Sequence, residues 1–311
     1  MAVDMFEELI EKLRGGKYIT LETTPTLSAK MENLLDKLEK SEAYKFVDGF
    51  TTTDNPLAKL KYGSLFGAIK LQERFQKPVI ATISMRDKNK IALQSDLLGA
   101  NDFNIRTILA LTGDSAKISD QPNSKGVFEG DSSLLLDIVD SFNNGINYAG
   151  KEFKPDERPE IIYPFSVINS VSKNPKTLIK KMIKKIEHHS IGVISQPVYS
   201  IEQAQNLLNM FETAKSSCKC NNPKAKLILG YFPINKFRTA KFLSSHVPGI
   251  DVPKLWLDNL RTASHISPEE EERVGMEMNK KLFNNLMEIH PKMHVMTANN
   301  FNLATKIISQ W

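Results

Sequence analysis

Acidic and amide side chains occur directly after several short apolar runs of this 311-residue sequence. Glu22 ends the first run, Asp114 follows the fourth run behind a glycine, and Gln196 ends the sixth. Two carboxylates in different surroundings can hold different protonation states, so that one gives a proton while the other carries a charge. The pattern therefore predicts acid–base chemistry on a small ligand, if the fold brings these residues together. Taken singly, each fits equally well as a turn former, a helix cap or, for Glu22, the partner of a rim lysine.

The runs that carry these residues resemble the strands of a parallel sheet. Each is short, apolar and rich in β-branched residues, which is typical of strands buried on both faces, and stretches with helical periodicity separate them. The runs are residues 18–22, 45–51, 79–84, 105–111, 160–165, 191–196, 226–231 and 293–297. Eight βα units close a barrel, and about 250 residues plus insertions account for the length. We therefore expect an α/β fold, a (β/α)8 TIM barrel, as a single domain over residues 1–311.

The connecting stretches carry helix signals. An extra amphipathic helix over residues 3–14 is expected to cover the lower end of the barrel, and helices are expected to open at Asn174-Pro175 and Ser267-Pro268. Segments 115–130 and 246–266 are longer than a connection requires, and long ordered segments in compact domains are often functional. In a barrel, the carboxyl ends of the strands and the loops that follow them form the active site, so we expect the polar residues to converge on that rim.

The net charge and the motifs present limit the classes of ligand that the protein is expected to bind. The excess of 41 basic over 36 acidic residues is too small to predict a nucleic-acid footprint, although it suits anionic small molecules. Lys176 and Lys180 are expected on the solvated face of their helix, whereas Lys181 and Lys185 lie nearer its apolar stripe and could hold a phosphate. No dinucleotide-binding glycine motif, P-loop or metal-ligand spacing occurs, so we expect no metal.

The cellular location follows from what the sequence lacks. Cys218 and Cys220 match no usual zinc spacing and are expected to be free thiols in a reducing cytosol. The amphipathic, acidic N-terminus is unlike a secretory signal, and no apolar run reaches about 18 residues. We therefore expect a cytoplasmic protein with no membrane partner.

Several short motifs, in this order along the chain, together resemble the 5,10-methylenetetrahydrofolate reductase family. They are Thr-Leu-Glu-Thr-Thr-Pro at 20–25, Thr-Asp-Asn-Pro at 53–56, Arg-Asp at 86–87, Leu-Gln-Ser-Asp-Leu-Leu-Gly-Ala at 93–100, Leu-Ala-Leu-Thr-Gly-Asp at 109–114, Ser-Gln-Pro-Val-Tyr at 195–199 and Gly-Tyr-Phe-Pro at 230–233. The resemblance covers nearly the whole chain and is closest to the forms found in anaerobic one-carbon pathways.

The resemblance implies a flavoprotein that reduces 5,10-methylenetetrahydrofolate to 5-methyltetrahydrofolate with electrons from NAD(P)H, feeding methionine biosynthesis or an anaerobic methyl branch. It makes Glu22 the general acid that opens the five-membered ring, and Asp114 the charge beside the resulting cation. Gln196 would contact the pterin, and Phe242 the folate side chain or the nicotinamide. The implied cofactor is FAD, with FMN as the alternative. The implied cofactor-binding residues are Thr53, Thr82, Leu111, Thr112, Gly113, Asp114, Tyr163, Lys181 and Lys185. A homo-oligomer is also expected.

Two other functions stay open. Thr112 and Asn300 stand where family members often carry arginine. The chain could therefore be a non-catalytic or partner-dependent subunit that receives electrons through another polypeptide. A flavin-free, pterin-binding methyltransferase barrel is the second alternative.

Overall fold

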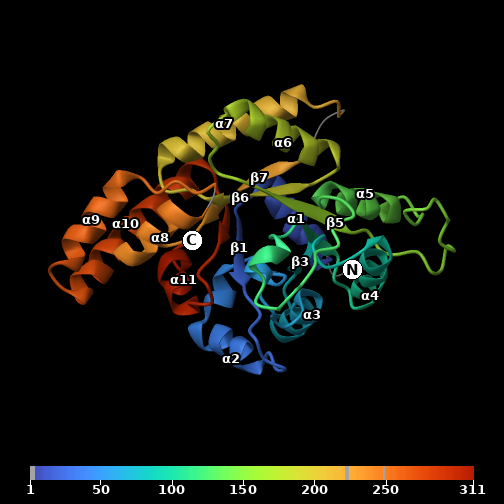
Figure 1. The fold of residues 1–311 in the computed structure, drawn as a ribbon, viewed down its shortest axis with the longest axis horizontal. Helices are drawn as coiled ribbons and strands as arrows, with labels where there is room; N and C mark the ends of the chain where they lie inside the picture. The colour runs from blue at the N-terminus through green and yellow to red at the C-terminus, as the bar shows by residue number, and fades with distance from the viewer. Residues whose placement is uncertain (1–3, 221–223, 248) are drawn as a thin grey trace.

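Eight parallel strands form a closed barrel in the computed structural model, which describes residues 4–220, 224–247 and 249–311 (Figure 1). Each strand pairs with the next along the chain, and β1 closes the barrel against β8. The strands are β1 (Tyr18–Thr23), β2 (Gly49–Thr52), β3 (Val79–Ser84), β4 (Thr107–Leu111), β5 (Tyr163–Ile168), β6 (Gly192–Pro197), β7 (Lys226–Tyr231) and β8 (Lys292–Val295). The predicted (β/α)8 barrel is therefore confirmed.

Helices surround this barrel (Figure 1). They are α1 (Met5–Gly15), α2 (Glu32–Ser41), α3 (Ser64–Phe75), α4 (Lys90–Asp102), α5 (Ser132–Asn143), α6 (Pro175–Glu187), α7 (Ile201–Ser217), α8 (Phe237–His246), α9 (Lys254–Ser264), α10 (Pro268–Ile289) and α11 (Phe301–Ile308). Short 3-10 helices occupy Ala43–Phe46, Pro56–Ala58 and Ala116–Ile118. Among the described residues, no helix combines the length and the apolarity that crossing a membrane requires.

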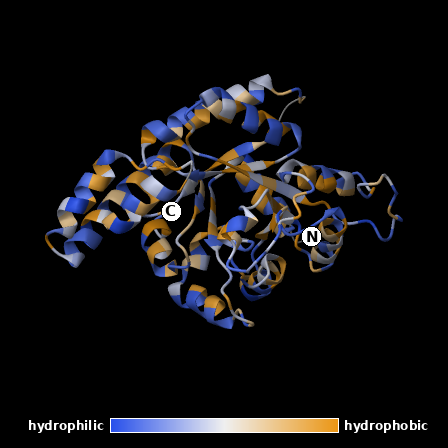
Figure 2. Ribbon diagram, viewed as in Figure 1, coloured by the Kyte–Doolittle hydropathy of each residue, from blue (hydrophilic) through white to orange (hydrophobic). Residues whose placement is uncertain are grey.

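The barrel interior is apolar toward the amino ends of the strands, where α1 covers it. Leu9, Ile10 and Leu13 of α1 form one buried cluster with inward-facing strand residues such as Phe165 and Ile228. Polar contacts fix the same helix, because Lys12 pairs with Asp48 just before β2 at 3.0 Å. A larger cluster fills the space between the strands and the outer helices, and Figure 2 shows hydrophobic residues concentrated on the strands. Since α1 packs over the barrel interior at this end, the interior opens at the opposite rim.

Element boundaries depart from the sequence expectations by three residues or more at two strands. The second run was placed at 45–51, but its first residues lie in the 3-10 helix Ala43–Phe46 and the strand is Gly49–Thr52. The fifth was placed at 160–165, but pairing with β4 begins at Tyr163 and the strand continues to Ile168. Apolarity alone does not set strand ends; the register with the neighbouring strands does.

The two long segments have different structures. Residues 115–130 contain one short 3-10 helix and are otherwise irregular. Segment 246–266 is not an extended connection, because α9 occupies most of it. Trp256, Leu260 and Ala263 are buried and lie on one face of α9. Charged and polar residues between them make this helical spacing hard to recognise in the sequence. Pro175 and Pro268 each begin a helix, as predicted, capped by the side chains of Asn174 and Ser267.

Candidate active site

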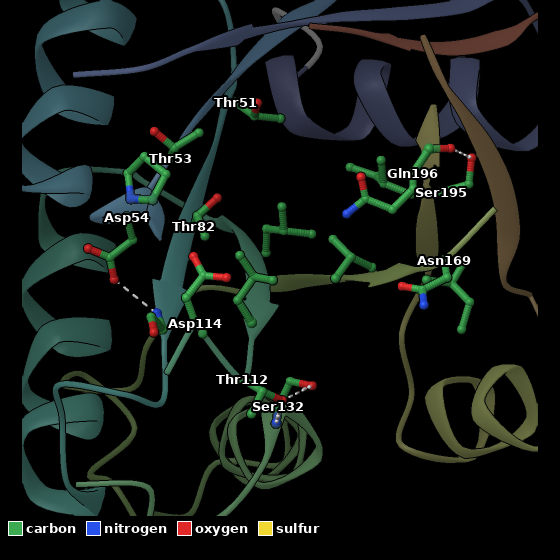
Figure 3. A pocket seen from close by; sticks show the side chains of 18 of the residues that line it. Thr51, Thr53, Asp54, Thr82, Thr112, Asp114, Ser132, Asn169, Ser195 and Gln196 are labelled. Atoms are coloured by element: carbon green, nitrogen blue, oxygen red, sulfur yellow. Dashed lines mark hydrogen bonds between the residues drawn. The ribbon is translucent and has the colours of Figure 1, made fainter. Parts of the chain in front are cut away.

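A cavity of about 550 Å³ opens at the carboxyl ends of the strands (Figure 3). Residues from the ends of β1, β2, β3, β4, β5, β6 and β8 line it, together with α6 and the start of α5. Figure 3 shows Asp114 and Gln196 on facing sides of the cavity, with Thr51, Thr53 and Thr82 along one wall. The predicted convergence of polar groups from separate strands is thus present in the structure.

Glu22 reaches the cavity from β1, close to a buried histidine of β8. Its side chain is 24% exposed and that of His294 is 4% exposed, with Oε2 of the glutamate 4.0 Å from Nε2 of the imidazole. The other ring nitrogen of His294, Nδ1, lies 2.9 Å from the hydroxyl of Thr20. If this hydroxyl donates to Nδ1, the proton of the neutral ring sits on Nε2, which faces Glu22. The imidazole therefore lies beside the carboxyl group, at a distance beyond a direct hydrogen bond.

Gly113 and Asp114 form the turn after β4. Gly113 has φ of +91°, and a Cβ added there would lie 2.2 Å from the Ser84 hydroxyl, so only glycine suits this position. The Asp114 carboxylate accepts a hydrogen bond of 2.7 Å from the backbone N–H of Leu57. Asp114 therefore does not cap the segment that follows it, where Ser115 is the cap; it fastens the loop after β2 while lining the cavity.

Further charged groups lie beside this turn. Asp54 lines the cavity and accepts a 2.9 Å hydrogen bond from the backbone N–H of Ser84, and burial raises the pKa of its carboxyl group. Arg86 is buried and pairs with Asp87 at 2.5 Å. Asp54, Asp114 and Glu22 together make this part of the cavity acidic.

Another part of the cavity, beside the turn after β4, is basic. Lys181, Lys184 and Lys185 of α6 line it together with Ser132, the first residue of α5. The Lys185 ammonium hydrogen-bonds the Ser132 hydroxyl, and burial lowers the pKa of this lysine. Lys184 pairs at 2.6 Å with Asp131, which caps α5. Cations beside a helix N-terminus are suited to a phosphate.

Most residues that the resemblance singled out line this cavity. They are Glu22, Thr53, Thr82, Leu111, Thr112, Gly113, Asp114, Lys181, Lys185 and Gln196. Lys176 and Lys180 are exposed, as their position on the helix predicted.

Two predicted site residues lie elsewhere. Tyr163 was wrongly assigned to the flavin cleft: it begins β5 and lines a second cavity at the amino end of the barrel. The three-residue offset of β5 explains this, because Val167, Ile168 and Asn169 occupy its carboxyl end instead. Phe242 is 53% exposed on α8, where its ring stacks on His246, and it does not line the cavity.

The sequence interpretation missed His294 and Ser132. His294 is a polar residue between two apolar ones in a predicted strand, a pattern that indicates an inward-facing polar side chain. Ser132 gave no comparable signal, because helix-starting serines are common and its meeting with Lys185 depends on how α5 packs beside α6.

The residues present fit a flavin by two observations. The Thr53 hydroxyl is buried in the cavity wall and, within the described part of the chain, has no hydrogen-bond partner, so it is available to a bound group. The basic group at α6 lines the same cavity, so a ligand with a ring system and a phosphate tail would find a cationic partner for its phosphate there. In residues 4–220, 224–247 and 249–311, no cluster of three or more His, Cys, Asp or Glu could hold a metal ion.

Fold and cavity define the class: a (β/α)8-barrel protein with acidic and basic side chains in a cavity at the carboxyl ends of its strands. Residues 6–311 match the family model for methylenetetrahydrofolate reductase, and the chain belongs to that family.

Individual relatives are distant. The methylenetetrahydrofolate reductase 2 of Schizosaccharomyces pombe is 23% identical over 301 residues, which cover 94% of this chain but 45% of the relative, so the chain spans less than half of that protein. Two solved structures share the fold. One is an uncharacterized Clostridium thermocellum protein described as binding two copies of 5-methyl-5,6,7,8-tetrahydrofolic acid, with a TM-score of 0.63, 15% identity and coverage of 99% of this chain and 100% of the other. The other is an F420-dependent secondary alcohol dehydrogenase with a TM-score of 0.59, 10% identity and coverage of 94% and 98%.

Proposed function

We propose that this chain is a flavin-dependent reductase that converts 5,10-methylenetetrahydrofolate to 5-methyltetrahydrofolate. One observation carries the proposal: Glu22 from β1 and the Gly113-Asp114 turn after β4 line the same cavity. Family membership over residues 6–311 supports the substrate class. The electron donor that we propose is NAD(P)H. Cytoplasmic location and homo-oligomeric assembly stay predictions from the sequence.

FAD is the proposed cofactor, with FMN as the alternative. Thr53 and the main chain at Gly113 would contact its ring system, and Lys185 beside the start of α5 would hold a phosphate. When bound, the flavin supplies the hydride that reduces the one-carbon unit.

The side chains around it supply proton transfer and charge. Glu22 donates a proton to the departing ring nitrogen of the folate, which opens the five-membered ring and leaves a cationic one-carbon unit. Asp114 carries the negative charge that stabilises this cation. His294 lies beside the Glu22 carboxyl group and can return a proton to it through one bridging water, because the 4.0 Å between Nε2 and Oε2 exceeds direct hydrogen-bond distance. Gln196, on the facing wall, is placed to bind the pterin.

The experiment separates the two half-reactions. The flavin-loaded protein is reduced anaerobically and mixed with methylenetetrahydrofolate, and flavin reoxidation is followed by absorbance. The unmodified protein is expected to reoxidise. Glu22→Gln is expected to lose this step by about 100-fold or more while its flavin is reduced at the normal rate. Glu202→Gln, an exposed change on α7, is the matched control. A flavin that stays reduced in the unmodified protein contradicts the proposal.

A flavin-free folate-binding barrel is the second candidate. It is supported by the Clostridium thermocellum protein of the same fold, which is described as binding two copies of a methylated tetrahydrofolate. The absorption spectrum of the purified protein distinguishes the candidates, because only a flavoprotein is yellow. A yellow protein that is reduced only when a second polypeptide is added indicates the partner-dependent subunit instead.

A further inference from the structure

The turn that follows β8 is strained. Ala298 and Asn299 have φ of 49° and 63°, and the N–H of Asn300 donates to the carbonyl of Thr297 at 3.0 Å. A turn whose two central residues are both left-handed favours glycine or asparagine, and alanine is unfavourable there. Such strain persists only where the surrounding structure holds it, and it is concentrated at functional sites.

Asn299 uses this conformation to hold the chain just after β1. Its Oδ1 accepts from the backbone N–H of Thr24 at 2.9 Å, and its Nδ2 donates to the carbonyl of the same residue at 2.7 Å. The backbone pairing of β1 with β8 ends at Leu21 and Val295. The side-chain amide offers the same donor and acceptor as a peptide group, so it continues the pairing beyond the last pair of the ladder.

Glu22 lies in the chain between Leu21, where the pairing with β8 ends, and Thr24, which Asn299 holds. On one side β2 holds its backbone, since Glu22 pairs with Thr51 and the ladder continues to Thr52. On the β8 side, Asn299 supplies the next main-chain attachment after the end of the ladder. Asn299 does not itself line the cavity, so it can affect a reaction there only through the segment it holds.

We infer that Asn299 is a positioning residue that fixes the Glu22 carboxyl group by clamping Thr24, an inference that rests on the proposed function for its catalytic consequence. The strained turn is what brings the amide into register with Thr24. A misplacement of about 1 Å at a catalytic group can slow a reaction about 100-fold. Loss of the contact between Asn299 and Thr24 can therefore slow the reaction measurably.

Two neighbouring substitutions separate the clamp from the strain. Asn299→Gly keeps a residue that tolerates positive φ and deletes the amide. Ala298→Gly keeps the amide and relieves the strain of its neighbour, and it serves as the matched control. Backbone hydrogen exchange at Thr24, measured by NMR, reports the clamp directly. The folate and flavin half-reactions report its consequence.

In Asn299→Gly we expect exchange at Thr24 to be about tenfold faster, because a hydrogen bond is lost. We also expect the folate step to be about tenfold slower. The KM for methylenetetrahydrofolate and the rate of flavin reduction should stay within about twofold, because the amide does not line the cavity. Ala298→Gly should leave all four quantities unchanged and raise the melting temperature. If Asn299 had a purely structural role, its replacement would lower stability but would not slow the folate step while leaving KM unchanged.

Unchanged exchange at Thr24 in Asn299→Gly would overturn the inference, as would faster exchange with an unchanged folate step. The proposed function fails separately, when the unmodified protein does not oxidise its reduced flavin with methylenetetrahydrofolate. In that case exchange at Thr24 still decides whether the clamp exists, and Glu22 loses its assigned role.

Discussion

Replacing Gly113 by alanine is expected to damage both stability and the candidate site. The residue has φ of +91°, and an alanine in a left-handed conformation costs about 1–2 kcal/mol. The new Cβ would lie 2.2 Å from the Ser84 hydroxyl and 3.0 Å from Cβ of Arg86. The hydroxyl accepts a 3.1 Å hydrogen bond from the Arg86 N–H, and losing it costs about 1 kcal/mol.

Overpacking of a filled site adds about 1–3 kcal/mol. The combined loss in the free energy of unfolding is therefore about 3–6 kcal/mol, measured by urea denaturation. Affinity for FAD should fall as well, because the turn that carries Asp114 must move.

Gly99→Ala is the matched control. Gly99 lies within α4, and a Cβ there would meet nothing within 4 Å, so alanine should stabilise the protein by about 0.5–1 kcal/mol. If Gly113→Ala proves as stable as the unmodified protein, the close contact with Ser84 and the left-handed turn cannot be as described.

Three further changes test other parts of the cavity. Lys185→Ala should weaken FAD binding about tenfold in a fluorescence titration, whereas the exposed Lys180→Ala should leave it unchanged; equal affinities would contradict a phosphate site at α6. His294→Leu should slow the folate step about 100-fold with flavin binding intact, and a normal rate would remove the imidazole from the proton path. Burial raises the pKa of Asp54 above its unfolded value, so the folded state binds more protons between the two pKa values and stability falls as pH rises through that window. Asp54→Asn should abolish this fall and be at least as stable at pH 7, and urea unfolding across pH 3–7 checks the sign.

The strands were predictable because a strand buried on both faces is a short, continuous run of apolar residues in the sequence. All eight apolar runs overlap the observed strands, and the helix starts at Pro175 and Pro268 follow from capping chemistry that acts within one turn. Strand ends were less predictable. The error at β5 moved Tyr163 from the middle of a strand to its beginning, at the opposite end of the barrel from the cavity.

The convergence of Glu22, Asp114 and Gln196 on one rim was also predictable, since parallel strands in a barrel all end on the same side. The individual partners were not. The contact of Glu22 with His294 joins residues 272 positions apart (294 − 22), and the amide of Asn299 meets Thr24 across a similar separation.

The linear order of apolar runs, caps and polar strand ends thus determined the barrel, the end at which its cavity opens and most residues lining it, because those features depend on periodicity and neighbouring residues. The tertiary structure alone decided which side chains meet: the closure of β1 against β8, the packing of α6 beside α5 and the register of β5. Those contacts depend on distances between segments that the chain brings together only when the barrel closes.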